Sequence, residues 1–464
     1  MAKDFIVAIE IGSSKMTGVA GKKNADGSIT VLAAVTENPD SCIRKGVVYK
    51  TDKTTQCLIN IVSKIETALK TEVTGVYVGQ GGQSVRSVKN TIVRDLPADT
   101  IVTEELVNSI MDANRDMIYP DYEILDVVTH EYKVGPQYQR DPVGIQADHI
   151  EGNFLNVLWR RQFARSLKKC FDDAGINVVD MYPSAIVLAD SVLTEAEKRT
   201  GCLLVDLGAE TTTVSVYYRD TLRHLAVIPL GSNNVTKDIE SLQIDEEEAE
   251  RLKLEYGCAY TEDKDYDKTK KYRLTDDRII DSIAFNEVVE ARVKEIVENV
   301  AFQVPDEYAG KLLGGVILTG GGSNMPNIEK VFRRATGIDR VRTATMVNVA
   351  VATSNVRIVL PQDGTTCIPL GLIMKGNTNC AGNAIEGSLF GPDGKARAAA
   401  NKAEAERKQR EAAEAAEAER IQREAEEAEE RRRQEEERKR GKLGRALRSF
   451  LNVIISGDPN ETKE

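Results

Sequence analysis

The chain has 464 residues, more than one hydrophobic core usually organises, so two or more domains are expected. Its residues are 41% hydrophobic and 29% charged, as in a soluble globular protein, and its formal net charge of −11 argues against a general nucleic-acid-binding protein, which would present a basic surface. The seven cysteines are scattered without a C-x-x-C pair, which argues against a disulfide framework or a zinc site and fits a reducing cytosol.

The N-terminal part of the chain predicts strands that end in glycine-rich turns. Residues 5–9 predict a buried strand, followed by a Gly-Ser-Ser turn and a return strand over 17–21. A further strand is predicted to run into V-G-Q-G-G at residues 78–82. The first apolar run is too short for a signal peptide, and no stretch of about 18 apolar residues occurs, so we expect a cytoplasmic protein without a membrane-spanning helix.

A change of pattern indicates a separate module after this strand. Residues 103–118 have helical periodicity, whereas residues 122–134 and 143–158 alternate like strands. We therefore expect residues 83–168 to form a small α+β module that is inserted into a larger frame.

The second half of the chain repeats the opening pattern and adds two helices. Strands are predicted over residues 202–207, 213–218 and 316–319, the last of which runs into three glycines. Helices are predicted over residues 245–257 and 278–302, the second with a stripe of valine and isoleucine. Because strand-turn-strand units open both halves, we expect an internal duplication with two related halves facing one cleft.

The composition changes abruptly after residue 391. Residues 401–440 contain 14 Glu and 12 Lys or Arg, with alanine at most other positions and many Glu–Lys or Glu–Arg pairs at the favourable i,i+4 spacing. Such a segment can be helical without a core behind it and would then be about 60 Å long. A coiled coil is the weaker interpretation, because Ile421 is the only large aliphatic residue in this segment. We predict a charged helical spacer over residues 391–440, with a disordered linker as the open alternative.

Two strand ends carry residues suited to phosphate binding. In A-I-E-I-G-S-S-K, residues 8–15, a glycine lets the backbone approach a phosphate, and the two serines and the lysine supply hydroxyl groups, N–H groups and positive charge. Alone, this pattern is better explained by an ordinary hairpin. The segment L-L-V-D-L-G-A-E-T-T-T-V-S-V-Y, residues 203–217, repeats it, with Asp206 placed to hold hydrated Mg²⁺. Two such units facing each other predict a phosphate clamp.

Two further segments complete a candidate nucleotide site. V-I-L-T-G-G-G-S-N-M-P, residues 316–326, places three glycines after a strand, so its backbone can lie flat against a ligand with the next helix N-terminus facing it. Glu250 and Lys253 lie at i,i+3 on one helical face and could reach the ribose and base of a nucleotide. Taken alone, that pair is better explained as a surface ion pair.

The order of these segments resembles the actin, Hsp70 and sugar-kinase superfamily, and within it the chain resembles the bacterial FtsA cell-division family. The motifs that carry the resemblance are I-G-S-S-K at 11–15, D-P-V-G at 141–144, S-V-L-T at 191–194, L-R-H-L-A-V-I-P at 222–229, E-A-E-R-L-K-L-E-Y-G-C-A at 248–259 and L-T-G-G-G at 318–322. The resemblance covers residues 4–376. It implies an α/β, actin-like two-domain ATPase fold with an inserted α+β module, followed by the charged helical spacer and a terminal amphipathic helix.

The FtsA resemblance also implies ATP and Mg²⁺ as ligands. The residues that would bind the nucleotide are Gly12, Ser13, Ser14, Lys15, Asp206, Gly208, Thr211, Thr212, Gly231, Glu250, Lys253, Gly320, Gly321, Gly322 and Asn324. Asp206 would hold Mg²⁺ through water, and Glu10 and Asp206 would be the candidate catalytic carboxylates.

The same resemblance implies four subdomains and their partners. They would be 1A at residues 1–82 and 169–200, 1C at 83–168, 2A at 201–238 and 310–390, and 2B at 239–309. Subdomain 1C would contact neighbouring copies in a filament and later division proteins, and 2B would dock the C-terminal tail of FtsZ. Arg292 matches the arginine of that FtsZ surface, although a solvated helix charge explains it equally well.

Two features depart from the superfamily pattern. The second phosphate turn is usually D-x-G-G-G-T, whereas this chain has Ala209 and Glu210 in place of two glycines. A carboxylate beside phosphates repels them unless Mg²⁺ intervenes, so ATP binding should be weakened and hydrolysis slow at best. Glu10 stands where superfamily ATPases often have aspartate.

The last segment predicts an amphipathic helix over residues 441–456. One broad face is apolar, the other is basic, and the helix is too short to span a bilayer. FtsA proteins end in a membrane-targeting helix of this kind, so anionic lipid is the expected partner. The residues expected to contact it are Leu443, Arg445, Leu447, Arg448, Phe450, Leu451 and Ile454. A helix that docks back on the globular body is the alternative.

These inferences together predict a structural rather than a metabolic protein. The main hypothesis is an ATP-binding, filament-forming anchor for the FtsZ ring at the cytoplasmic face of the inner membrane, at the division site. Two alternatives keep the fold: a phosphotransferase of the sugar-kinase branch and a pilus-assembly relative that shares the 1C module. The first would need a substrate domain, which the sequence does not offer, and the second should lack the terminal helix.

Overall fold

The computed structural model describes residues 4–39, 42–262, 270–275 and 277–384. The chain divides into two compact units, Met1–Leu389 and Phe390–Glu464, and every described residue belongs to the first. The spacer predicted at residues 391–440 and the amphipathic helix predicted at 441–456 lie outside the described residues.

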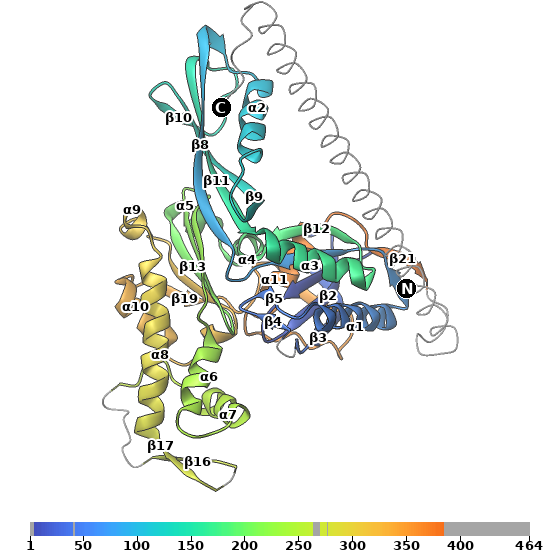
Figure 1. Ribbon diagram of the computed structural model, residues 1–464, viewed down its shortest axis with the longest axis vertical. Helices are drawn as coiled ribbons and strands as arrows, with labels where there is room; N and C mark the ends of the chain where they lie inside the picture. The colour runs from blue at the N-terminus through green and yellow to red at the C-terminus, as the bar shows by residue number, and fades with distance from the viewer. Residues whose placement is uncertain (1–3, 40–41, 263–269, 276, 385–464) are drawn as a thin grey trace, which may run out of the picture. The chain divides into compact units, whose positions relative to one another are not determined.

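The first sheet has six strands in the order β12-β7-β1-β2-β3-β20, of which Figure 1 labels β12, β2 and β3. These strands are β1 (Ile6–Ile11), β2 (Met16–Lys23), β3 (Ile29–Glu37), β7 (Val76–Gln80), β12 (Val178–Pro183) and β20 (Val351–Thr353). Strand β2 pairs antiparallel with β1 and β3, whereas β7 runs parallel to β1 and to β12. The strand pair predicted at residues 5–9 and 17–21 is confirmed.

Helices pack against both faces of this sheet because β2 carries glycines that leave room for them. A Cβ at Gly18 would lie 2.3 Å from Cγ2 of Ile61, and a Cβ at Gly21 would lie 2.8 Å from Cδ1 of Ile373, each on a different helix. The helices of this layer are α1 (Thr51–Leu69), α3 (Arg161–Ala174), α4 (Ser184–Val192) and α11 (Cys367–Lys375), whereas α5 (Glu195–Thr200) packs against the second sheet. Helix α3 packs on α1, so the boundary that the sequence suggested at residue 168 falls inside a helix of this layer.

The second sheet has nine strands in the order β10-β9-β11-β8-β15-β14-β13-β18-β19. Its strands are β8 (Arg86–Ile101), β9 (Tyr122–Val134), β10 (Gln137–Gln139), β11 (Gln146–Arg160), β13 (Cys202–Leu207), β14 (Thr212–Tyr218), β15 (Thr221–Ile228), β18 (Gly315–Thr319) and β19 (Val341–Thr343). The run β19-β18-β13-β14-β15 repeats the first sheet's β12-β7-β1-β2-β3 with the same parallel and antiparallel pairings. The predicted duplication is thus present in the topology.

The inserted module consists of β8 to β11 and α2 (Glu104–Arg115), with an apolar core of its own. Strand β11 pairs with β8 on one side and β9 on the other, and α2 packs on this sheet. Thr103 begins α2 by accepting a hydrogen bond from the N–H of Leu106 at 3.2 Å. The helix and the two strands that the sequence predicted here are confirmed.

Three helices with a common core extend from the second sheet. They are α6 (Ser232–Glu240), α7 (Glu246–Tyr256) and α8 (Ser282–Phe302), together with the hairpin β16 (Lys271–Arg273) and β17 (Ile279–Asp281). The helix predicted from residue 278 therefore begins later than expected. Asp281 ends the strand and caps α8, because its side chain accepts a hydrogen bond from the N–H of Ile283 at 3.0 Å.

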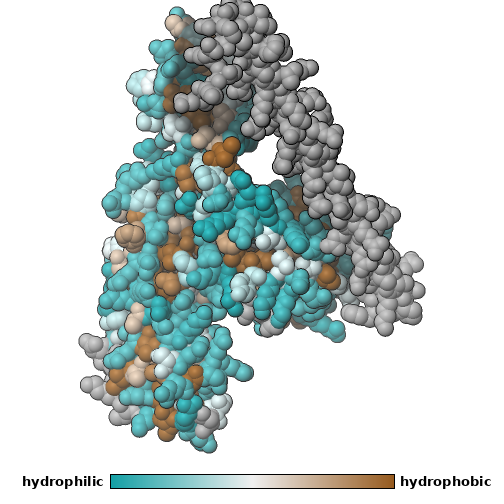
Figure 2. All heavy atoms as spheres, in the orientation of Figure 1, coloured by the Kyte–Doolittle hydropathy of each residue, from teal (hydrophilic) through white to brown (hydrophobic). Residues whose placement is uncertain are grey.

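Short elements complete the described fold. They are β4 (Ile43–Arg44), β5 (Val47–Val48), β6 (Thr71–Val73), α9 (Asp306–Ala309), the 3₁₀ helix η2 (Gly321–Asn324), α10 (Ile328–Thr336) and β21 (Ala381–Ala384). Figure 2 shows a mostly hydrophilic face with scattered hydrophobic patches, since most large apolar side chains lie in three buried cores. Within the described residues, no helix combines the length and the apolar character needed to cross a bilayer.

Candidate nucleotide site

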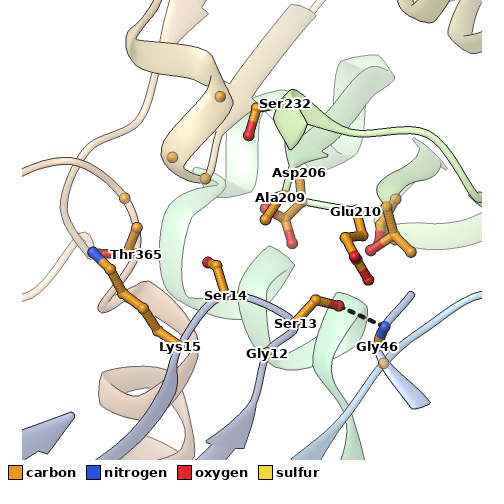
Figure 3. A pocket seen from close by; sticks show the side chains of 18 of the residues that line it. Gly12, Ser13, Ser14, Lys15, Gly46, Asp206, Ala209, Glu210, Ser232 and Thr365 are labelled. Atoms are coloured by element: carbon orange, nitrogen blue, oxygen red, sulfur yellow. Dashed lines mark hydrogen bonds between the residues drawn. The ribbon is translucent and has the colours of Figure 1, made fainter. Parts of the chain in front are cut away.

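A cavity of about 570 Å³ lies between the two sheets, in the size range of small-molecule sites (Figure 3). Its lining contains Glu10 and all but two of the residues that the FtsA resemblance assigned to the nucleotide. Those lining residues are Gly12, Ser13, Ser14, Lys15, Asp206, Gly208, Thr211, Glu250, Lys253, Gly320, Gly321, Gly322 and Asn324. The duplicated halves therefore bring together segments that are far apart in the sequence.

The first phosphate turn folds tightly after β1. A Cβ at Gly12 would lie 2.5 Å from the carbonyl oxygen of Lys15, so the turn needs a glycine at its start. The hydroxyl of Ser13 accepts a hydrogen bond of 2.8 Å from the backbone N–H of Gly46, which Figure 3 shows as a dashed line. Ser14 and Lys15 also line the cavity, so a hydroxyl group and a positive charge are available to a phosphate.

The second turn is fixed from behind by the start of α6. The N–H groups of Ser232 and Asn233 donate to the carbonyl oxygens of Gly208 and Ala209, at 3.0 and 2.7 Å. These bonds use N–H groups that the first turn of a helix leaves unpaired, so α6 holds the turn in place.

The two assigned residues that do not line the cavity are Thr212 and Gly231. Thr212 is fully buried, and its hydroxyl donates to the carbonyl oxygen of Leu230 at 2.8 Å. Gly231 is the N-cap residue of α6, and a Cβ there would lie 2.5 Å from the carbonyl oxygen of Ala209. Both residues shape the second turn from behind rather than facing the space a ligand would fill.

Glu10 and Asp206 occupy equivalent positions in the two halves. Glu10 pairs with Thr17 on the neighbouring strand, as Asp206 pairs with Thr213. Burial and the nearby Asp206 raise the pKa of Glu10 to about 8, and burial raises the pKa of Asp206 to about 6. Two carboxylates with raised pKa values in one cavity are suited to a cation, whose charge would favour their ionised forms.

A Mg²⁺ ion fits this pair if a nucleotide supplies further ligands. Among the described residues, no group of three or more His, Cys, Asp or Glu side chains is placed to hold a metal ion. Mg²⁺ is usually held by one or two carboxylates together with waters and substrate phosphates, which matches Glu10 and Asp206 beside two phosphate turns. The chain alone does not form a dedicated metal cage in its described part.

Because the pKa of Glu10 is raised in the folded chain, the free energy of unfolding of wild type should depend on pH more strongly than that of the Glu10→Gln variant. Between pH 4.5 and about 8 the unfolded chain has an ionised Glu10 and the folded chain a protonated one, so the folded state binds more protons. The free energy of unfolding should therefore fall as pH rises through this window, by up to about 1.4 kcal/mol per pH unit. Urea unfolding at pH 5 and pH 8.5 should show a steeper loss for wild type than for Glu10→Gln, and equal slopes would contradict the raised pKa.

Lys253 and Glu250 belong to one hydrogen-bonded network, in which Lys253 is buried and the side chain of Glu250 is 41% exposed. Lys253 is only 6% exposed, and its Nζ donates to Oε2 of Glu250 at 2.6 Å and to Oγ1 of Thr236 at 2.8 Å. The hydroxyl of Thr236 donates to the same Glu250 oxygen at 2.6 Å. The interpretation as a surface ion pair is therefore wrong for Lys253. Because both residues line the cavity, the network orients them towards a ligand.

Two of the three glycines after β18, Gly320 and Gly322, allow close packing against the end of β13. Gly320 has a positive φ of 80°, and a Cβ there would lie 2.3 Å from Oδ1 of Asp206. Asn324 donates from Nδ2 to the carbonyl oxygen of Asp363 at 2.8 Å, which ties η2 to the loop before α11. The glycines thus form a close-packed wall of the cavity.

Several residues that line the cavity were not found from the sequence. They include Gly46, Gln80, Ser184, Ser232, Asn233, Asp363 and Thr365. Gln80 lies in the V-G-Q-G-G segment that the sequence singled out as a turn, so its glycines were a usable signal. The others reach the cavity only through the tertiary fold and have no local motif.

Two family models match the chain. One is described as "Cell division protein FtsA" and matches residues 203–366, and the other as "SHS2 domain inserted in FTSA" and matches residues 82–158. Cell division protein FtsA of Porphyromonas gingivalis is 28% identical over 340 residues, which are 71% of this chain and 70% of that protein. The FtsA protein of Pseudomonas aeruginosa is 29% identical over 334 residues, 69% of this chain and 78% of that protein. The chain belongs to the FtsA family.

The FtsA resemblance drawn from the motifs is thereby confirmed, and the inserted module is the family's SHS2 domain. The predicted α/β, actin-like two-domain fold with an inserted α+β module is confirmed as well. The solved PilM-PilN type IV pilus biogenesis complex has a TM-score of 0.54 and 16% identity, and covers 82% of this chain and 99% of that chain. At this identity the likeness concerns the fold alone. The matches to FtsA proteins favour cell division over the pilus-assembly and sugar-kinase alternatives.

Proposed function

We propose that this FtsA-family chain binds ATP with Mg²⁺, polymerises at the membrane, and anchors FtsZ polymers to the cytoplasmic face of the inner membrane at the division site. The observation that best supports the proposal is the cavity between the duplicated halves. Two candidate phosphate turns, two carboxylates and the hydrogen-bonded pair Glu250 and Lys253 line that cavity, an arrangement that suits ATP.

The proposed role is structural, with ATP as a ligand that favours the polymer. Turnover should be slower than about 1 per second, the low end of the range typical of enzymes. The inserted module, β8 to β11 with α2, is proposed to contact neighbouring copies and later division proteins. The subdomain division into 1A, 1C, 2A and 2B is part of the same proposal.

The surface proposed for the C-terminal tail of FtsZ lies on the helices of 2B, around Arg292. Its guanidinium donates to both oxygens of Asp238, at 2.6 and 3.0 Å, and to Glu295, and the side chain is 22% exposed. Arg292 is therefore not the free, solvated charge that was the alternative interpretation. The bond to Asp238 links α8 to α6 and holds the cation in one place, which suits recognition of a peptide.

Membrane attachment is proposed for the amphipathic segment at residues 441–456, on the strength of its sequence pattern. One copy binds lipid weakly, because the gain from burying five large apolar side chains, about 7–10 kcal/mol, is largely offset by the entropy of ordering the helix. Copies arrayed along a filament would bind together with far higher avidity. Attachment through a polymer therefore explains how a short helix can hold a ring.

The test is co-sedimentation of FtsZ with vesicles that contain anionic lipid. FtsZ should pellet with vesicles only when the wild-type chain and ATP are present. Arg292→Glu should keep ATP and vesicle binding but lose FtsZ, with affinity for an FtsZ tail peptide at least about tenfold weaker, or 1.4 kcal/mol. ATP binding should persist in this variant because Arg292 does not line the cavity.

Asp238→Asn is the matched control, because it weakens the internal ion pair while leaving Arg292 cationic. If Arg292 contacts the tail, this variant keeps FtsZ binding. Equal loss in both variants would mean that the ion pair only supports local structure. Unchanged tail affinity in Arg292→Glu would remove this residue from the FtsZ surface.

A further inference from the structure

A hydrogen bond joins the two halves of the chain at the phosphate end of the cavity. The acceptor is Oε2 of Glu210, in the turn between β13 and β14, and the donor is the backbone N–H of Lys45, at 2.5 Å. The two residues are 165 positions apart and belong to different sheets. Glu210 is also the residue that replaces a glycine of the usual second phosphate turn.

The donor side of this bond is a tight hairpin turn. Strands β4 and β5 pair Arg44 with Val47, which leaves Lys45 and Gly46 as a two-residue loop. Both have positive φ, 49° and 72°, as a type I′ turn requires. The N–H groups of the two loop residues take no part in the hairpin pairing, so both can donate outward. One donates to Glu210 and the other to Ser13.

The hairpin turn is held rigidly on the first half of the chain. The carbonyl oxygen of Lys45 accepts from the N–H of Gln83 at 2.9 Å. A Cβ at Gly46 would lie 2.5 Å from Cα of Gly82, and a Cβ at Gly82 would lie 2.5 Å from the carbonyl oxygen of Gly46. The second turn is fixed equally well by α6, as described above. A bond between two such anchored turns therefore couples the halves themselves.

We propose that Glu210 is an interdomain clasp that closes the phosphate end of the cleft on the Lys45 N–H and so slows nucleotide exchange. Glu210 acts here as a positioning residue: its carboxylate, at the edge of a cavity that the residue also lines, accepts a hydrogen bond from a backbone donor of the opposite half. The halves are then held together by the chain's own carboxylate, and a nucleotide leaves only when the clasp opens. The effect on exchange rests on the proposed ATP site, whereas the clasp itself does not.

The variants that test the clasp separate two properties of the Glu210 side chain, its length and its charge. Glu210→Ala removes both, and Glu210→Asp keeps the charge but shortens the side chain by one methylene. Glu210→Gln removes the charge but keeps an oxygen that can accept from Lys45. Lys45→Gly is the matched control, because the donor is the backbone N–H and glycine favours the positive φ of this position.

The first measurement needs no nucleotide. Hydrogen exchange followed by mass spectrometry reports the Lys45 amide in the full chain. Exchange there should be at least about tenfold faster in Glu210→Ala and Glu210→Asp, because the amide loses its acceptor. Glu210→Gln and Lys45→Gly should stay close to wild type, and the Gly46 amide, bonded to Ser13, should serve as the internal reference. Equal Lys45 exchange in wild type and Glu210→Ala would overturn the clasp.

The second measurement is dissociation of the fluorescent nucleotide mant-ADP in the presence of Mg²⁺. Glu210→Ala and Glu210→Asp should release it about tenfold faster, and Glu210→Gln should release it at nearly the wild-type rate. The opposite order, with Glu210→Asp like wild type and Glu210→Gln altered, would mean that charge repulsion acts and would overturn the proposal. If mant-ADP does not bind but Glu210 protects the Lys45 amide, the ATP site fails and the clasp stands. If mant-ADP binds without that protection, the clasp alone fails.

Discussion

Gly321→Glu is expected to abolish ATP binding in a chain that still folds. A Cβ at this position meets only Cγ2 of Thr365, at 3.7 Å, so the backbone accepts a side chain without distortion. A glutamate there enters the cavity and adds a negative charge to a space that Asp206 and Glu10 already share. Affinity for ATP with Mg²⁺ should fall by at least about 100-fold, or 2.7 kcal/mol, as measured by isothermal titration calorimetry.

Alanine substitutions at Gly321 and at the neighbouring Gly320 serve as controls for this result. Gly321→Ala adds only the Cβ that the site accommodates, so it should bind ATP almost as wild type does. Gly320→Ala should instead lower stability, because its positive φ strains an alanine and the new Cβ would lie 2.3 Å from Oδ1 of Asp206. Thermal unfolding separates the two effects. A folded Gly321→Glu variant with wild-type affinity would place the nucleotide elsewhere.

Local patterns were sufficient to predict the frame of the site. The buried strands that end just before Gly12 and Gly208 are short apolar runs followed by turn residues, and both signals act within a few positions of the chain. The repeat of this pattern in the second half indicated the duplication, which the strand order of the two sheets reproduces. Once two related halves are assumed, their equivalent turns must face one another, so most of the cavity lining follows from the sequence.

The remaining site features depend on side-chain direction and tertiary contact. Thr211 and Thr213 line the cavity, whereas Thr212 points the other way, as the alternation of a strand requires. The resemblance assigned Thr212 to the nucleotide together with Thr211, and the period of two of a strand could have separated these neighbours. Nothing local predicts that the carboxylate of Glu210 bonds to the N–H of Lys45, because their contact spans 165 positions. The expectation that its charge repels phosphates stays a prediction, because Glu210 also lines the cavity.

The terminal segment should account for membrane binding, although it lies outside the described residues. Its basic residues Arg445 and Arg448 should each contribute about 1 kcal/mol on anionic lipid, an effect that fades with salt. Its apolar residues must enter the acyl region, where a charge has to stay hydrated. The two contributions can be separated, because one depends on ionic strength and the other does not.

Phe450→Glu is expected to release the chain from vesicles, because Phe450 falls near the centre of the apolar face that the sequence predicts, and a charge there would lift such a helix from the interface. Asn452→Glu is the matched control, since it adds the same charge on the polar face and repels anionic lipid equally. Co-sedimentation with anionic vesicles should therefore show loss for Phe450→Glu and a much smaller change for Asn452→Glu. Deleting residues 441–464 should abolish pelleting while ATP binding persists. If the truncated chain pellets as well as the full one, the segment docks on the globular body and another surface binds the membrane.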